Sequence, residues 1–81
     1  MIFTIEVTRK QIGNSLRAAR MKIGISQNRL GILSGVCVRN INFWESGGGD
    51  PPISAIIRIA STLGTTIDEL VGISNNSKEE E

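Results

Sequence analysis

The fold of this chain is decided by residues 25–47, which read ISQNRLGILSGVCVRNINFWESG. Ser26 is a good helix N-cap, because its hydroxyl can accept a hydrogen bond from a backbone N–H of the first turn. Ile25 and Leu30 have the spacing of the apolar pair that packs across such a helix start. Gly35 can adopt the left-handed conformation that ends many helices. The stretch therefore predicts one short helix from Ser26 to Gly35, with a second directly after it.

The second short helix begins at Cys37, with Val36 and Ile41 as its apolar pair, and the chain turns again at Gly47. Two helices joined by a turn that contains glycine form a helix-turn-helix unit. The second helix of such a unit can lie in the major groove of DNA. The sequence therefore predicts a reading helix over residues 38–46.

The two faces of this helix differ in chemistry. Ile41 and Trp44 are three residues apart, so they share the face that packs on the rest of the protein. The face left free carries side chains that can bond to or touch base edges, namely Val38, Arg39, Asn40, Asn42 and Phe43. An ordinary amphipathic helix with a solvated polar face is the alternative. An exposed phenylalanine counts against that alternative.

This pattern resembles the phage Cro/repressor-type (XRE-like) helix-turn-helix regulators. The resemblance runs without an insertion from about Ile12 to about Val71. It is carried by Ser26, Gln27, Leu30, Gly35, Val36, Ile41, Trp44, Glu45, Gly47, Pro51, Leu63, Gly64, Asp68, Glu69 and Leu70. It implies an all-α, compact five-helix bundle, a lambda-repressor-like DNA-binding domain in a prokaryotic or phage protein. It also implies a homodimer that binds an inverted-repeat site in double-stranded DNA and regulates transcription, as a repressor.

The resemblance also implies roles for single residues. Arg20 matches an arginine that pairs with the glutamate at the end of the reading helix, here Glu45, although a solvated Arg20 is equally compatible with the sequence. Gln27 matches a glutamine that touches a DNA phosphate and braces the reading helix. The predicted DNA-binding residues are thus Gln27, Val38, Arg39, Asn40, Asn42, Phe43 and Ser46. The candidate dimer contacts are Ile67, Val71 and Ile73, with simple closure of the core as the alternative.

Two departures from the family pattern concern glycines. Gly31 stands where alanine is usual, and it keeps the clearance between crossing helices at a cost of about 1 kcal/mol in helix propensity. Gly48 and Gly49 stand where the family often has basic residues that contact the DNA backbone. Such contacts would have to come from backbone N–H groups of this loop. The loop is not a nucleotide-binding loop, because no Gly-Lys-Ser/Thr follows it.

The charge of the chain is unevenly distributed. It has 81 residues, enough for one domain with one modest core, and its net charge is only +1. However, seven basic and no acidic residues lie between Val7 and Trp44, whereas the acids are Glu6 and those from Glu45 onward. This asymmetry predicts a positive field that attracts polyanions. An ordinary solvated surface is the alternative, but such surfaces usually mix both signs.

The flanking segments divide the chain into three parts. Residues 1–7 alternate as a strand does and are predicted to be an arm or a strand, residues 8–73 form the domain, and the acidic residues 74–81 form a disordered tail. Thr8 with Gln11 and Thr66 with Glu69 have capping-box spacing, which predicts helix starts there. The first helix has an apolar stripe and ends at Gly24; the stripe is Ile12, Leu16, Ala19 and Ile23.

A fourth helix is predicted to begin with Pro52 as its first residue and to end at Gly64. Its predicted buried side consists of Ile53, Ile56, Ile57, Ala60 and Leu63. Without histidine there is no Cys/His metal site, and a single cysteine forms no intrachain disulfide. No cofactor is predicted.

Other classes of protein are disfavoured. No histidine is present to act as a base, so an enzyme is not expected. Cys37 is the one reactive candidate, since a helix start favours the thiolate, but a small substitute for a capping serine is the simpler reading. The chain has no apolar run of roughly 20 residues and no basic signal-peptide start, so we expect a cytoplasmic location and no membrane. An antitoxin-like or adaptor protein-interaction module is the rival function, supported by Gly48, Gly49, Ile32, Leu33 and Phe43.

Overall fold

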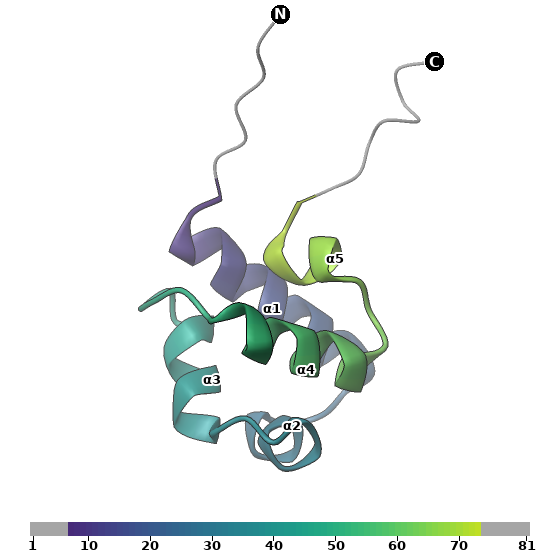
Figure 1. Cartoon of the computed structure of the whole chain (residues 1–81). Coiled ribbons are helices and arrows are strands. Elements are labelled where there is room, and N and C mark those ends of the chain that lie inside the picture. Colours follow the sequence, from purple (N-terminus) through teal and green to yellow (C-terminus); the bar gives the residue numbers. More distant parts are fainter. Residues whose placement is uncertain (1–6, 74–81) are drawn as a thin grey trace, which may run out of the picture.

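The computed structural model describes residues 7–73, which form five α-helices and no strand (Figure 1). The predicted arm or strand at residues 1–7, apart from Val7, and the predicted tail at residues 74–81 lie outside the described residues. The helices are α1 (Arg9–Ile23), α2 (Gln27–Ser34), α3 (Val38–Glu45), α4 (Ile53–Leu63) and α5 (Ile67–Val71). The all-α, five-helix fold predicted from the sequence is therefore confirmed.

Side-chain caps begin three of the helices where the sequence predicts them. The hydroxyls of Thr8, Ser26 and Thr66 accept hydrogen bonds from the backbone N–H three residues on, at 3.0–3.1 Å. These bonds satisfy amide groups that have no partner within the helix. Four helices end at a glycine with a positive φ, and these are Gly24, Gly35, Gly64 and Gly72.

The capping box predicted at Thr8 and Gln11 was wrong in its reciprocal half. The Gln11 side chain donates to the Gly72 carbonyl at 2.9 Å, and so joins the start of α1 to the end of α5. The Glu69 carboxylate accepts from the Thr65 hydroxyl. This bond and then the backbone N–H of Thr66 lower the pKa of Glu69. Pro52 is the N-cap residue of α4 with an extended backbone, so the helix begins one residue later than predicted.

One hydrophobic core joins all five helices. Each helix contributes one residue that is 0% exposed; these are Leu16, Leu30, Ile41, Ile59 and Leu70. Full burial of each such side chain contributes about 1.5–3 kcal/mol to folding, before the cost in chain entropy. The smaller residues of the core, Ala55 and Ala60 on α4, lie among them.

The buried side of α4 was predicted only in part. Ile56, Ala60 and Leu63 are buried, but Ile53 and Ile57 are 64% and 51% exposed, and the core instead takes Ala55 and Ile59. Apolar residues occupy a wider arc of this helix than the core covers, so periodicity alone does not select the buried face. The last residue of the α1 stripe, Ile23, is likewise 53% exposed.

The packing places α3 at the side of the domain. Helix α1 packs against α3 and α5, whereas α2 packs against α3 and α4. In Figure 1, α2 and α3 form one end of the domain and α5 lies at the other. The outer side of α3 is thus left uncovered by the other helices. Within residues 7–73, no helix has the length and apolar character needed to cross a membrane.

Candidate nucleic-acid interface

An ion pair fixes α3 to α1. Two guanidinium nitrogens of Arg20 donate to the two carboxylate oxygens of Glu45, Nε to Oε2 at 2.7 Å and Nη2 to Oε1 at 3.0 Å. The two side chains are only 12% and 4% exposed. Nη1 of Arg20 also donates to the Ile25 carbonyl at 2.7 Å. The hydrogen bond to Glu45 is the largest cause of the raised pKa of Arg20. One guanidinium therefore holds together α1, the turn before α2, and the end of α3.

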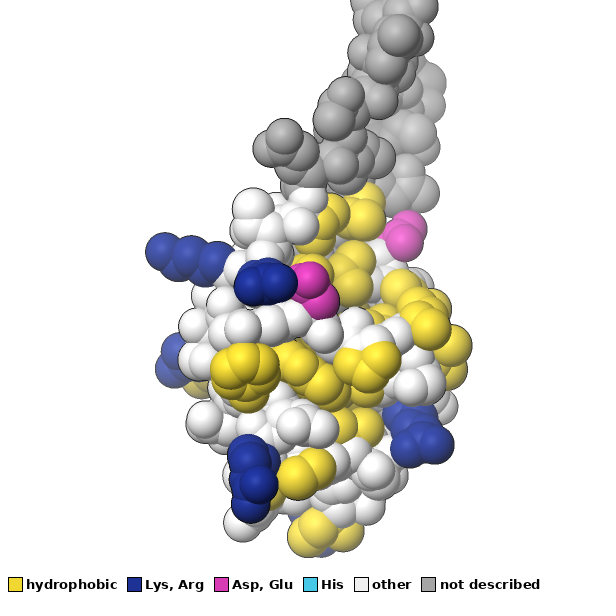
Figure 2. All heavy atoms as spheres, turned by 60° about the vertical axis from the view of Figure 1, so that its left-hand side comes forward, with side chains coloured by type: hydrophobic (Ala, Val, Ile, Leu, Met, Phe, Trp, Pro, Cys, Tyr) yellow, Lys and Arg dark blue, Asp and Glu magenta, His cyan; other side chains and the backbone are white. Residues whose placement is uncertain are grey.

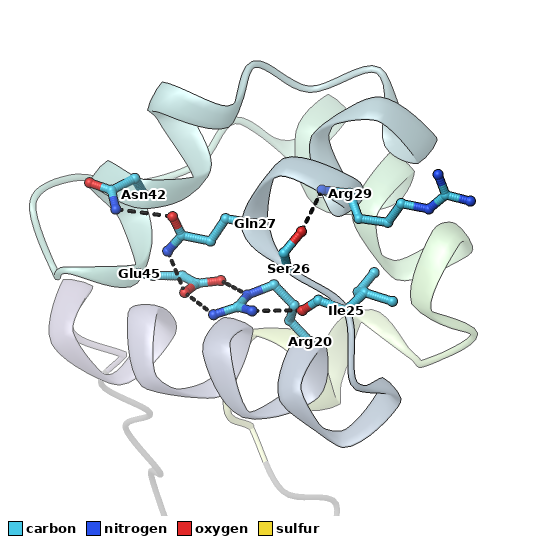
Figure 3. A network of polar contacts seen from close by, with 7 residues as sticks. All are labelled: Arg20, Ile25, Ser26, Gln27, Arg29, Asn42 and Glu45. Carbon is cyan, nitrogen blue, oxygen red and sulfur yellow. Dashed lines mark hydrogen bonds and ion pairs between the residues drawn. The ribbon is translucent and has the colours of Figure 1, made fainter.

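Hydrogen bonds extend from this pair to the surface (Figure 3). Gln27 Nε2 donates to Glu45 Oε1 at 2.9 Å, and Asn42 Nδ2 donates to Gln27 Oε1 at 3.0 Å. Because a carboxylate only accepts, Glu45 sets which way the Gln27 amide faces. Gln27 thus braces α3 against α2, while the Oδ1 atom of Asn42 points away from the network in Figure 3.

The two faces of α3 are separated as predicted. Ile41 is 0% exposed and Trp44 is 6% exposed, so both lie in the core. No acidic side chain among residues 7–73 pairs with Arg39. The opposite face is exposed along its whole length, and it carries Val38, Arg39, Asn40, Asn42 and Phe43. Figure 2 views the side of the domain on which α3 lies, and Lys and Arg side chains surround hydrophobic groups there.

A polar hollow of about 210 Å³ adjoins this face and opens between α1, α2 and α3. It is lined by Arg17, Arg20, Gln27, Asn42, Glu45 and Ser46. Arg17 is exposed at its rim. Arginine, glutamine, asparagine and serine side chains donate hydrogen bonds to phosphate oxygens in protein–DNA contacts, whereas the Glu45 carboxylate only accepts and is paired with Arg20. The hollow therefore offers donors beside a helix whose outer face offers base-reading groups.

The comparison with protein families matches residues 16–70 to the helix-turn-helix family HTH_3. The chain belongs to this family. The match covers every residue of the network and of the exposed α3 face described above. Membership of this DNA-binding, XRE-type family of transcription regulators points to a regulator and not to an enzyme. It confirms the family that the sequence resembles.

Solved structures of similar fold include the restriction-modification controller protein C.AhdI from Aeromonas hydrophila. It is 29% identical, with a TM-score of 0.73, over 76% of this chain and 94% of that one. An HTH_3 family transcriptional regulator from Vibrio cholerae is also 29% identical, with a TM-score of 0.72, over 76% of this chain and 35% of that longer one. A hypothetical transcription factor, NHTF from Neisseria, shares the fold at 20% identity and a TM-score of 0.73, over 98% and 93% of the two chains. No curated protein matches the chain.

The end of α3 and the loop that follows it differ from the prediction. Helix α3 ends at Glu45, and Ser46 is its C-cap residue, with a hydroxyl that donates to the Phe43 carbonyl at 2.7 Å. The backbone N–H groups of Gly47 and Gly48 donate to the Trp44 and Phe43 carbonyls. Of the two glycines at which the sequence predicts backbone contacts to DNA, Gly48 thus has its N–H engaged within the protein.

Cys37 begins α3 without acting as a side-chain cap. The backbone N–H groups of Arg39 and then Asn40 lower the pKa of its thiol, although no hydrogen bond of normal cap geometry forms. The side chain is exposed, so a modified thiol would lie beside Arg39.

A close contact that the sequence analysis missed is at Gly13, where α1 crosses the end of α3. A Cβ added to Gly13 would lie 3.0 Å from the Glu45 carbonyl oxygen and still closer to that of Trp44. Gly31 gives similar clearance, because its Cβ would lie 2.9 Å from the Val36 carbonyl oxygen. The available signal for Gly13 was its presence inside an amphipathic helix, where glycine is costly unless packing requires it.

Proposed function

We propose that this HTH_3 protein binds an inverted-repeat site in double-stranded DNA as a homodimer, with α3 in the major groove, and represses transcription there. The observation that carries the proposal is the outer face of α3. It presents Arg39, Asn40 and Phe43 to solvent on a helix that is locked from behind by a buried ion pair. Because the ion pair fixes the helix, only the exposed side chains lose freedom when they bind base edges. Two of the similar solved structures are a restriction-modification controller protein and a transcriptional regulator, which agrees with this function.

The individual roles follow from chemistry and position. Arg39 has a guanidinium that can donate twice to guanine O6 and N7. Gln27 and Arg17 border the polar hollow and are placed to contact a phosphate. Asn42 holds one N–H on Gln27, so its outward Oδ1 is suited to accept from an exocyclic amino group of a base. The Ser46 hydroxyl borders the same hollow and is a further phosphate contact in this proposal.

Apolar groups that the core leaves uncovered support the dimer. Ile67 on α5 is 40% exposed, while Val71 and Ile73 are half-buried, and Val71 also packs on the core. Ile53 and Ile57 on α4 add exposed apolar surface. Burial of these side chains against a second copy would remove them from water. The two reading helices of the dimer would then have to lie about 34 Å apart, which is one turn of B-DNA.

The test is selection of preferred sites from a random DNA pool, followed by titration of the selected duplex at several salt concentrations. The proposal expects a palindromic consensus with half-sites about 10 bp apart or a multiple of that, two protomers per duplex, and affinity that falls modestly with added salt. A promoter that contains the selected site should be silenced when the protein is expressed. Salt-independent binding, a single half-site, or no consensus would contradict the proposal.

A charge placed on the proposed dimer surface gives a sharper test. Ile67→Lys should weaken dimer formation in sedimentation experiments and also weaken binding to the two-half-site duplex. Ile32→Lys is the matched control, because Ile32 is 73% exposed on α2 and lies outside the proposed contact. Equal oligomeric states of both variants and the wild type would place the dimer contact elsewhere.

A protein-interaction module is the second candidate function. It is supported by Ile32 and Leu33, which are 73% and 52% exposed on α2. Exposed large apolar side chains that lie together are typical of protein contacts. A random-pool selection that returns no DNA consensus would favour this function over the first.

A further inference from the structure

Gly48 and Gly49 differ from the glycines that shape the backbone. Within residues 7–73, the glycines at 24, 35, 47, 64 and 72 have positive φ, which explains why glycine stands there. Gly48 and Gly49 have φ values that any residue adopts. Backbone conformation therefore does not account for the missing side chains at these two positions.

The ring of Phe43 occupies the space that side chains at these positions would need. A Cβ on Gly48 would lie 2.6 Å from Cδ1 and 2.9 Å from Cζ of that ring, and closer still to Cε1. A Cβ on Gly49 would lie 2.7 Å from Cε2. Real Cβ atoms essentially never come within 3.0 Å of another heavy atom. Both edges of the ring therefore rest against the two glycines.

The loop that carries these glycines is fastened to the helix that carries the ring. The Gly48 N–H donates to the carbonyl of Phe43 itself at 3.0 Å, and the Gly47 N–H donates to the Trp44 carbonyl at 3.0 Å. The Ser46 hydroxyl also donates to the Phe43 carbonyl. The position of the glycines relative to α3 is thus fixed by bonds to the end of α3.

Although it rests on the glycines, Phe43 remains 51% exposed, on the same outer face as Arg39. The exposed part of the ring is free to make an apolar contact with a partner that approaches this face. In the major groove the apolar group on a base edge is the C5-methyl of thymine, which 5-methylcytosine also carries. A methyl of this kind would cover the exposed part of the ring.

We infer that Gly48 and Gly49 form a seat for the Phe43 ring, and that the seated ring is a specificity-determining contact for a pyrimidine 5-methyl group in the DNA site. The inference rests on the proposed function, because it needs α3 in the major groove. Gly48 and Gly49 act as positioning residues, since they touch the ring and not the DNA. Any side chain at either position would displace the ring from the place where it meets the methyl group.

The test uses the DNA site selected by the wild-type protein and removes one methyl group at a time. Each thymine of a half-site is replaced in turn by deoxyuridine, which keeps every hydrogen-bonding group, and binding is measured by fluorescence anisotropy. At one position per half-site, the wild type should bind about fourfold more weakly to the uracil duplex, which is the value of one buried methyl.

Variants then test the Phe43 ring and the two glycines separately. Phe43→Ala should bind thymine and uracil duplexes equally. Gly48→Ala and Gly49→Ala should also lose most of the fourfold preference, although the ring is still present. Because the ring is the end of a flexible side chain, alanine at position 48 should move the ring and leave the fold intact, which thermal melts followed by circular dichroism check. In the Phe43→Ala background, Gly48→Ala should have no further effect on binding, because nothing then fills the space above it.

The outcomes distinguish this inference from the proposed function. Binding to a selected palindrome with no thymine-to-uracil difference at any position would overturn the methyl contact and leave DNA binding intact. A Gly48→Ala effect of equal size with and without Phe43 would overturn the seat. Failure to select any DNA site would instead overturn the proposed function, on which the inference depends.

Discussion

The two faces of α3 differ in whether their side chains have partners within the protein. The inner face places Ile41 and Trp44 in the core and joins Glu45 to Arg20, so each group there has a partner within the protein. The outer face leaves Arg39 without an acidic partner among the described residues and holds Phe43 half in water. Residues that stabilise the fold and residues that are free to bind thus lie on opposite faces of one helix of eight residues. Substitutions on the two faces should therefore separate stability from DNA affinity.

The largest effect is expected on the inner face. Glu45→Ala removes the partner of a guanidinium that is only 12% exposed, so the free energy of unfolding should fall by about 3–5 kcal/mol. Replacement of both Arg20 and Glu45 by alanine should cost less than the sum of Arg20→Ala and Glu45→Ala, because no unpaired charge remains. Urea unfolding of the four proteins measures the coupling. Additive losses would mean that Arg20 and Glu45 do not stabilise the fold through each other.

Arg39→Ala on the outer face should leave unfolding unchanged and weaken binding to the selected site by about 1–3 kcal/mol. It should also relax the preference at one base pair of each half-site. Gln27→Ala is the comparison variant, because its proposed contact is a phosphate, and it should weaken binding evenly across sequences. Repeated site selection with each variant distinguishes the two. If Arg39→Ala selects the wild-type consensus, the assignment of Arg39 as a base reader is wrong.

How far the sequence predicts this molecule depends on the range of the interactions involved. The caps at Ser26 and Thr66 and the stop at Gly35 are local, and each lies where the sequence predicts it. Gln11 and Ile57 were predicted wrongly because their surroundings depend on packing: one bonds to a carbonyl 61 residues away, and the other lies on an apolar helix with several possible buried faces.

The candidate site shows the same division. The periodicity of α3 predicts which side chains face outward, since Ile41 and Trp44 determine the buried side. It does not predict that Asn42 bonds to Gln27, nor that the Phe43 ring lies on Gly48 and Gly49. Those contacts join separate elements or a helix to its following loop, and only their spatial arrangement shows them.

The contact between α1 and the end of α3 gives a smaller effect on stability. Gly13→Ala introduces a Cβ against the carbonyl oxygens of Trp44 and Glu45, which are backbone atoms and move little. Overpacking of this kind costs about 1–3 kcal/mol, and the better helix propensity of alanine offsets roughly 1 kcal/mol of it. A net loss of up to about 2 kcal/mol is expected in urea unfolding. An increase in stability would show that the two helices can separate without cost.

The smallest effect is expected at Cys37, the exposed N-cap residue of α3. Cys37→Ser should keep DNA binding and leave the free energy of unfolding equal or higher by about 0.5 kcal/mol, because serine is a good N-cap.

In the wild type, the N–H groups of Arg39 and Asn40 lower the pKa of the Cys37 thiol, which favours the thiolate. The rate of alkylation by iodoacetamide should therefore remain high at pH values below the ordinary thiol pKa of about 8.5. The alkylated protein should lose affinity for the selected duplex, since the added group lies beside Arg39 on the outer face, whereas Cys37→Ser treated in the same way should not. If the alkylated wild type binds DNA normally, the start of α3 does not approach the bases, and the reading face has to be moved toward its other end.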